Sequence, residues 1–171
     1  MRKLLLVTLG AASVSVALFA GVGGASDGGY ESAMGAAERS ATTNLGDRHV
    51  AFNAVNGPRG TSGEFTSHRQ LAPGLGPGPL LTFTGDVTCL LVDGNRAVIG
   101  GIIRQSLLAE TEGTMFFAAV EDNGTPASGS LPDQVSAYFI NVPGVDACEE
   151  AAPGLFPSLA PVESGNVRVS G

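Results

Sequence analysis

The stretch that decides the fold is LTFTGDVTCLLVDGNRAVIGGIIRQ, residues 81–105. From Leu81 to Leu91 every second residue is apolar or glycine and most of the intervening residues are polar, an alternation typical of a half-buried strand. Asp93-Gly94 follows, and this pair favours a tight hairpin turn because both residues tolerate positive φ. The alternation resumes from Arg96 to Gln105. The stretch therefore predicts an antiparallel hairpin.

Further strands are predicted on both sides of this hairpin. Residues 50–54 and 61–66 alternate around Asn56-Gly57-Pro58 and form a second predicted hairpin, while the proline- and glycine-rich segment 70–79 must be a loop. The remaining predictions are strands at 115–121, 134–142 and 166–170, short helical turns at 32–39 and 106–110, and an irregular tract at 151–161.

Closely spaced strands with turn residues between them are typical of an all-β fold. Gly85, Gly100 and Gly101 lie inside predicted strands, where glycine favours bulges or strong coiling. We therefore expect an antiparallel β-sandwich or a small closed barrel of about 7–8 strands. The predicted organisation is one β domain at 47–171, preceded by a flexible segment at 26–46.

The first 25 residues have the pattern of a secretory signal peptide. Arg2 and Lys3 form a positive start, residues 4–20 are almost wholly apolar, and Gly23-Gly24-Ala25 is a small-residue cleavage site. A membrane span is the competing interpretation, since the apolar stretch is near the lower length limit. The Gly-rich exit and the lack of a second hydrophobic span favour cleavage, so we expect a secreted, extracellular protein with no integral membrane segment after cleavage.

Export gives the two cysteines a simple interpretation. Cys89 and Cys148 form an even pair in an oxidising compartment, where a disulfide is expected. The bond would close a loop of about 60 residues and contribute about 4 kcal/mol in the chain-entropy model.

Charge and composition exclude several classes of function. The net charge is −7, which argues against binding nucleic acid, and removal of residues 1–25 makes the chain more acidic still. Lys3 is the only lysine, so the mature chain lacks a Schiff-base or phosphate-loop lysine. No cofactor motif is found, and we predict no cofactor.

Four side chains are the candidates if a site exists. His49 and His68 are the only histidines, and the second hairpin can bring them together as a surface metal pair or supply the base of a hydrolase. Glu121 and Asp122 can supply oxygen ligands to Ca²⁺, although hairpin turns favour the same residue types. We interpret all four as exposed or turn residues and predict no catalytic or metal site.

Five phenylalanines define the alternative interpretation. If they line an open barrel, the protein is a carrier of small apolar ligands; if they fill the core, binding is left to the surface. The filled core is the expectation, so the predicted function is a non-catalytic exported domain with a binding or structural role, whose partner is a protein or a cell-envelope component. A secreted hydrolase is the third alternative. The five residues are Phe52, Phe65, Phe83, Phe116 and Phe139.

Several motifs together resemble a family of secreted bacterial β-domains related to post-COAP type domains. They are GDVTCLLVDGNRAVIGG (85–101), AVEDNGTP (119–126), PDQVS (132–136) and SGNVRVSG (164–171). The resemblance covers roughly residues 47–171. It implies an exported antiparallel β fold with this hairpin and cysteine pair, and it implies no catalytic residue.

Overall fold

The protein is described by a computed structural model that covers residues 30–39, 48–69, 82–125 and 130–171. The predicted signal peptide at 1–25 and the predicted loop at 70–79 lie outside these residues. Within them the chain forms nine strands and one α-helix, with two short 3₁₀ turns at Ala109–Thr111 and Phe156–Ser158. The strands are β1 (Glu31–Arg39), β2 (Arg48–Gly57), β3 (Gly60–Arg69), β4 (Phe83–Asp93), β5 (Arg96–Ser106), β6 (Met115–Glu121), β7 (Gln134–Ile140), β8 (Ala160–Pro161) and β9 (Ser164–Ser170), and the helix is α1 (Cys148–Leu155).

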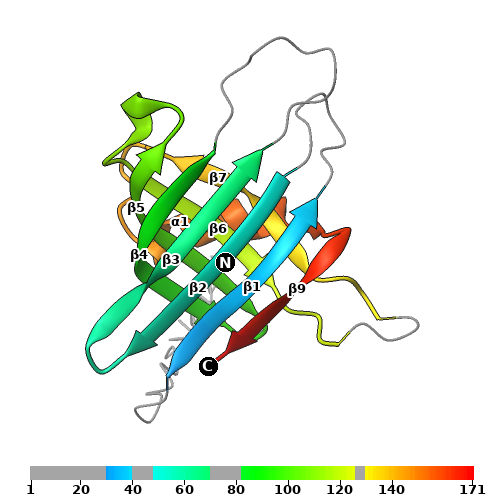
Figure 1. The fold of residues 1–171 in the computed structure, drawn as a ribbon. Coiled ribbons are helices and arrows are strands. Elements are labelled where there is room, and N and C mark those ends of the chain that lie inside the picture. The colour runs from blue at the N-terminus through cyan, green and yellow to red at the C-terminus, as the bar shows by residue number, and fades with distance from the viewer. Residues whose placement is uncertain (1–29, 40–47, 70–81, 126–129) are drawn as a thin grey trace, which may run out of the picture.

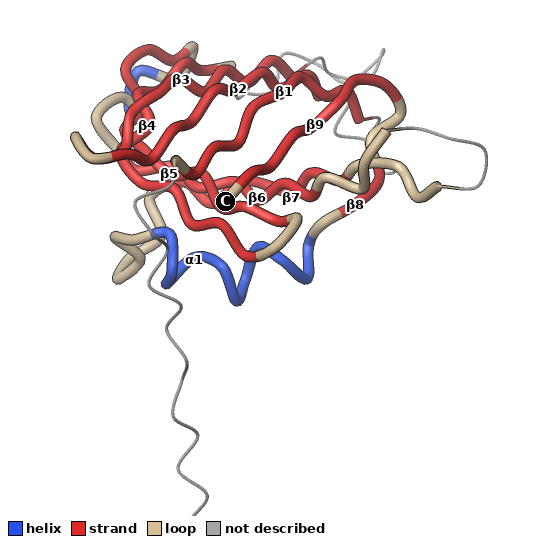
Figure 2. Tube along the Cα trace, turned by 90° about the horizontal axis from the view of Figure 1, so that it is seen from below, coloured by secondary structure: helices blue, strands red, loops and turns tan. Residues whose placement is uncertain are grey.

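The strands form one curled antiparallel sheet in the order β8-β7-β6-β5-β4-β3-β2-β1-β9 (Figure 1). Consecutive strands are neighbours throughout β1 to β8, which is the usual arrangement of sequential strands. Figure 2 shows the curl, with β3, β2, β1 and β9 along one side and β5, β6 and β7 along the other. The prediction of an antiparallel all-β fold is confirmed, with nine strands where about 7–8 were expected.

The hairpin predicted at 81–105 is confirmed as β4 and β5. Asp93 pairs with Arg96 at its end, and Gly94 has the positive φ of 64° that the turn requires. The predicted alternation of β4 is wrong after Val87, because a bulge shifts the register between Val87 and Cys89. An extra residue turns the following side chains to the opposite face. Leu90 therefore packs inside the curl, and Cys89 packs outside it.

The concave face of the sheet holds the main core. Aromatic rings pack against one another across it, with centroids 5.0 Å apart for Phe65 and Phe116 and 5.3 Å apart for Phe83 and Phe116. Phe52 and Tyr138 extend the same cluster. Four of the five predicted phenylalanines thus fill this side of the sheet. The prediction for Phe139 is wrong, because it belongs to the second core on the convex face.

The second core lies between α1 and the convex face of β4 to β7 (Figure 2). Cys148, Ala151 and Leu155 of α1 are completely buried there. The predicted disulfide between Cys89 and Cys148 is present, with 6.0 Å between the Cα atoms, and it fastens the start of α1 to β4.

The irregular tract predicted at 151–161 is corrected, because its first residues belong to α1. The Glu150 carboxylate accepts hydrogen bonds from the backbone N–H groups of Asp146 and Ala147 and so caps the helix start. Pro153 lies inside the helix and has no N–H to donate to the carbonyl oxygen of Glu149, four residues before it.

The segment predicted as a flexible stretch at 26–46, with a helical turn at 32–39, contains β1. This strand pairs with both β2 and β9. Its inward residues Ala33, Gly35 and Ala37 are small, so the sequence carries little strand signal. Close packing explains the small residues: a Cβ on Gly35 would lie 2.3 Å from the carbonyl oxygen of Asn166.

Two aspartates link the edge strand β9 to the segment between β6 and β7. Asp133 accepts a hydrogen bond from the backbone N–H of Val167 at 2.7 Å, and Asp122 accepts one from Val169 at 3.0 Å. Both donors belong to β9, and both acceptors lie between β6 and β7. Carboxylate oxygens therefore accept hydrogen bonds from backbone N–H groups of β9 that would otherwise pair with a neighbouring strand. No helix in the described ranges has the length and apolarity needed to cross a bilayer.

Candidate functional site

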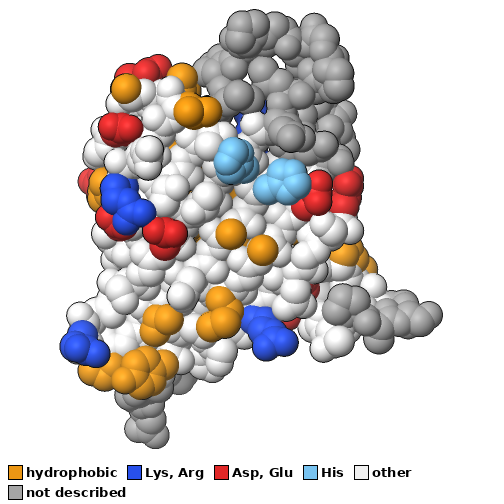
Figure 3. All heavy atoms as spheres, in the orientation of Figure 1, with side chains coloured by type: hydrophobic (Ala, Val, Ile, Leu, Met, Phe, Trp, Pro, Cys, Tyr) orange, Lys and Arg blue, Asp and Glu red, His pale blue; other side chains and the backbone are white. Residues whose placement is uncertain are grey.

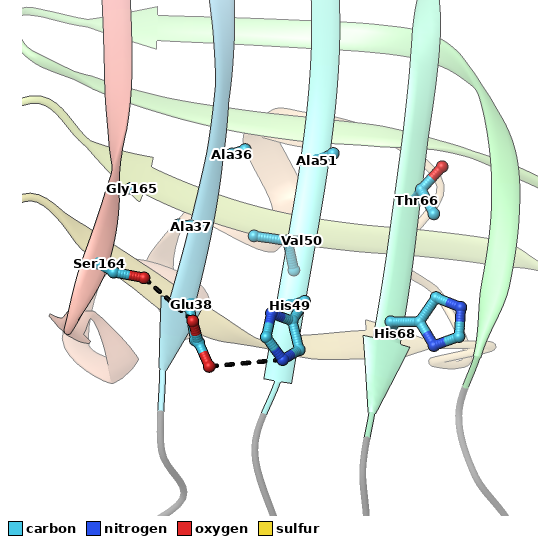
Figure 4. Close-up of a pocket in the computed structure, with 10 residues that line it drawn as sticks. All are labelled: Ala36, Ala37, Glu38, His49, Val50, Ala51, Thr66, His68, Ser164 and Gly165. Carbon is cyan, nitrogen blue, oxygen red and sulfur yellow. Dashed lines mark hydrogen bonds and ion pairs between the residues drawn. The ribbon is translucent and has the colours of Figure 1, made fainter.

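Two rows of polar side chains cross the same end of the sheet, one on each face. The convex row follows the strand register, with Ser164 opposite Glu38, Glu38 opposite His49, and His49 opposite His68. These residues rim a shallow depression of about 340 Å³ (Figure 4). Its floor is a neighbouring row of small residues that includes Ala36, Ala51 and Thr66, and the two imidazoles are visible beside it in Figure 3.

The convex row is a hydrogen-bonded chain with the carboxylate in the middle. Ser164 Oγ donates to Glu38 Oε2 at 3.0 Å, and Glu38 Oε1 lies 3.4 Å from His49 Nε2. A serine nucleophile needs the histidine between itself and the acid, so that the imidazole takes the hydroxyl proton. Here the acid separates the two groups, and the arrangement does not activate Ser164.

The structure brings His49 and His68 into neighbouring positions, as the predicted hairpin requires. Both are exposed, which confirms the prediction that they face solvent. Figure 4 shows the His68 ring turned away from His49 rather than converging with it. Within the described ranges, no group of three His, Cys, Asp or Glu side chains is arranged to hold a metal ion.

The other two candidate residues have structural positions. Asp122 accepts hydrogen bonds from the backbone of Gly124 and Val169 through its two oxygens. The first bond is typical of a turn, and Gly124 has a positive φ of 85°. Glu121 is the last residue of β6 and lies opposite Arg96 on one side and Gln134 on the other. Neither carboxylate converges with His49 or His68.

The concave row consists of three arginines, one on each of three adjacent strands. Arg39 ends β1 opposite Arg48, which begins β2, and Arg48 lies opposite Arg69 at the end of β3. Strand alternation turns them inward, because each is next in sequence to a residue that faces outward, namely Glu38, His49 or His68. All three are half-buried. We call this set the arginine row.

The arginine row reaches across the concave side to β7. Arg39 Nη1 donates to the carbonyl oxygen of Val135 at 3.3 Å, and Arg48 Nη1 donates to that of Ser136 at 2.9 Å. The Arg48 guanidinium also stacks on the ring of Tyr138, 4.1 Å from its centroid. In the part of the chain that the structure describes, no carboxylate forms a salt bridge with Arg39 or Arg48.

Tyr138 forms the floor below the arginine row. Its ring packs edge-on against Phe65 and Phe83, and its hydroxyl is hydrogen-bonded to Ser67 Oγ at 2.5 Å. Burial raises the pKa of Tyr138, so the hydroxyl stays protonated at neutral pH. Burial, and next the charge of Arg48, lower the pKa values of Arg39 and Arg69.

Sequence reasoning missed the arginine row. The available signal was strand parity: Arg48 precedes the apolar positions Val50 and Phe52 by two and four residues, and Arg69 follows Phe65 by four. The missing step was the recognition of β1, which contributes Arg39 and places the row across three strands.

Comparisons with known proteins give no relative: no family model, no curated protein and no solved structure matches the chain.

Proposed function

We propose that this protein is an exported, non-catalytic binding domain that uses surface groups rather than an enclosed apolar cavity. The observation that carries the proposal is the stacked aromatic cluster of Phe52, Phe65, Phe83, Phe116 and Tyr138 on the concave face. These rings occupy the space in which a carrier would hold its ligand.

The sheet is proposed to act as a closed barrel. Asp122 and Asp133 join β9 to the segment between β6 and β7, so the edge strand β9 is held against the opposite side of the curl. A closed and filled body of this kind, with a disulfide to α1, makes a rigid support for groups at its surface. Rigidity of this kind suits a binding role outside the cell.

Export is proposed from two features that support each other. The residues 1–25 have the signal-peptide pattern, and the paired cysteines suit an oxidising compartment. The resemblance to secreted bacterial β-domains is proposed on the motifs at 85–101, 119–126, 132–136 and 164–171. The hydrolase alternative has less support, because the Ser164–Glu38–His49 chain has the wrong order for nucleophilic catalysis.

A neutral fluorescent probe distinguishes a filled core from a carrier. Titration of the full chain with Nile red is expected to show no saturable one-to-one binding, since no apolar space is left. The positive control is Phe65→Ala, which removes a buried ring and opens a cavity of the kind that binds apolar molecules. Saturable binding to the unsubstituted protein, blocked by a fatty alcohol, would contradict the proposal and favour the carrier.

A further inference from the structure

The convex row carries an inference about what the surface binds. His49 and His68 are the only histidines of the chain, and they lie directly opposite each other on β2 and β3. Glu38 continues the row on β1, opposite His49. The Cβ atoms of directly opposite residues on neighbouring strands lie about 4.5–5.5 Å apart. Three side chains of the types that bind transition metals are thus gathered in one row across three adjacent strands.

The contact between Glu38 and His49 has the spacing of two metal ligands. Glu38 Oε1 lies 3.4 Å from His49 Nε2, which is beyond the usual range of about 2.7–3.2 Å for an N–H···O hydrogen bond. Zn²⁺ binds imidazole nitrogen and carboxylate oxygen at about 2.0–2.2 Å, so two donors of a tetrahedral site lie about 3.4 Å apart. Two atoms at this separation can therefore share one ion.

Ser164 holds the carboxylate in this position. Its Oγ donates to Glu38 Oε2 at 3.0 Å, and the other carboxylate oxygen, Oε1, is the one nearest His49 (Figure 4). Hydrogen bonds of this kind, from residues that do not touch the metal, orient the ligands that do. The place of Ser164 beside the acid, which does not suit a nucleophile, therefore suits a positioning residue.

His68 completes the ligand set by a rotation of its ring. In the structure the ring points away from His49 (Figure 4). The side chain is exposed at the rim of the depression, so it can turn about its Cα–Cβ bond without displacing buried residues. Side-chain rotamers commonly change when a partner binds. Both imidazoles are visible from outside in Figure 3, so an ion in solution can reach the row.

We propose that Glu38, His49 and His68 form a surface site for a Zn²⁺ ion, with the fourth position left to water. The site rests on the proposed binding function and names its ligand. Two imidazole nitrogens and one carboxylate oxygen match the ligands that Zn²⁺ prefers, whereas Ca²⁺ and Mg²⁺ prefer oxygen alone. No metal role was expected from the sequence, because β1 was not recognised and Glu38 could not be placed beside the histidines.

Titration calorimetry of the untagged chain, with its disulfide intact, tests the proposal with Zn²⁺ as the probe. One equivalent should bind saturably, and Ca²⁺ should give no binding at the same concentrations. Loss of a residue that only orients a metal ligand typically costs about 10–100-fold in affinity. His49→Gln and His68→Gln each remove a ligand, so each should weaken Zn²⁺ binding tenfold or more. Glu64→Gln is the matched control, because it removes an exposed carboxylate of β3 outside the row and should leave the affinity unchanged.

Proton NMR provides a second readout, which a purely structural role of the row would not move. The chain has only two histidines, so the imidazole signals of both should shift together when Zn²⁺ is added. A shift of one histidine alone, no saturable binding, or an affinity that His68→Gln does not change would overturn the three-ligand site, as would an equal loss in Glu64→Gln. Glu38→Gln serves as a further ligand variant if either histidine variant does not fold, as judged by its thermal transition. These outcomes leave the filled core untouched, because the Nile red titration measures it separately.

Discussion

Two glycines of β5 show how closely the neighbouring strands and the second core are packed against each other. Gly100 lies under Phe117 and the disulfide, where a Cβ would be 2.6 Å from Cys89 Sγ. Gly101 lies against β4, where a Cβ would be 2.0 Å from the carbonyl oxygen of Asp86. These glycines were predicted to mark bulges or coiling, and a bulge is present in the paired segment of β4. Their identity is set by close backbone approach as well as by curvature.

We expect Gly101→Ala to lower the free energy of unfolding by about 3 kcal/mol, because the contact is with backbone that cannot rotate away. Urea denaturation measures the loss. Gly60→Ala is the matched control, since its added Cβ meets no atom within 4 Å and costs only the positive φ of 94°, about 1 kcal/mol. Equal losses in the two variants would show that the close approach at Gly101 is relieved by a small shift of β4.

At the scale of the elements, the sequence analysis is correct where strands alternate strongly and wrong where packing overrides the local pattern. The hairpin β4–β5 was predicted from Asp93-Gly94 and its flanking apolar residues. The strand β1 was missed because its inward positions are Ala and Gly, and α1 was missed because Pro153 and Gly154 lie inside it.

The polar rows of the candidate site were also predictable only in part from the sequence. The neighbouring positions of His49 and His68 follow from one hairpin, so sequence reasoning could find them. The arginine row needs three strands in register, one of which has almost no sequence signal. The role of Asp133 depends on the approach of β9 to the segment between β6 and β7, a contact between residues distant in the chain that no local pattern reports.

The helix α1 depends on its covalent attachment as well as on burial. We expect the double variant Cys89→Ala/Cys148→Ala to lose about 4 kcal/mol of stability, because the 59-residue separation makes a long loop that the disulfide restrains in the unfolded chain. Chemical denaturation measures the loss, and hydrogen exchange should show faster exchange in α1 than in β5.

Reductant supplies the control for this prediction. It should shift the unfolding midpoint of the unsubstituted protein towards that of the double variant and leave the double variant unchanged. A midpoint that is insensitive to reductant would mean that burial of Ala151 and Leu155 alone holds the helix in place.

At the scale of the whole molecule, the curl of the sheet brings together groups that are far apart in the chain. The concave side joins the arginines of β1, β2 and β3 to Tyr138 and the carbonyls of β7. Where the curl meets β9, the backbone N–H groups of Val167 and Val169 donate hydrogen bonds to Asp133 and Asp122.

The contact between β9 and Asp133 gives the last prediction. Asp133 is buried and accepts hydrogen bonds from the backbone N–H groups of Asn123 and Val167, one on each carboxylate oxygen. Asp133→Asn replaces one acceptor by a donor, so one buried N–H loses its partner and faces another N–H. We expect a loss of about 1–3 kcal/mol of stability, measured by urea denaturation.

The matched control is Asp146→Asn, which makes the same change at an exposed position and should alter stability by less than about 0.5 kcal/mol. If stability does not change, the carboxylate bonds to β9 are replaced by water, and the curl of the sheet does not depend on them.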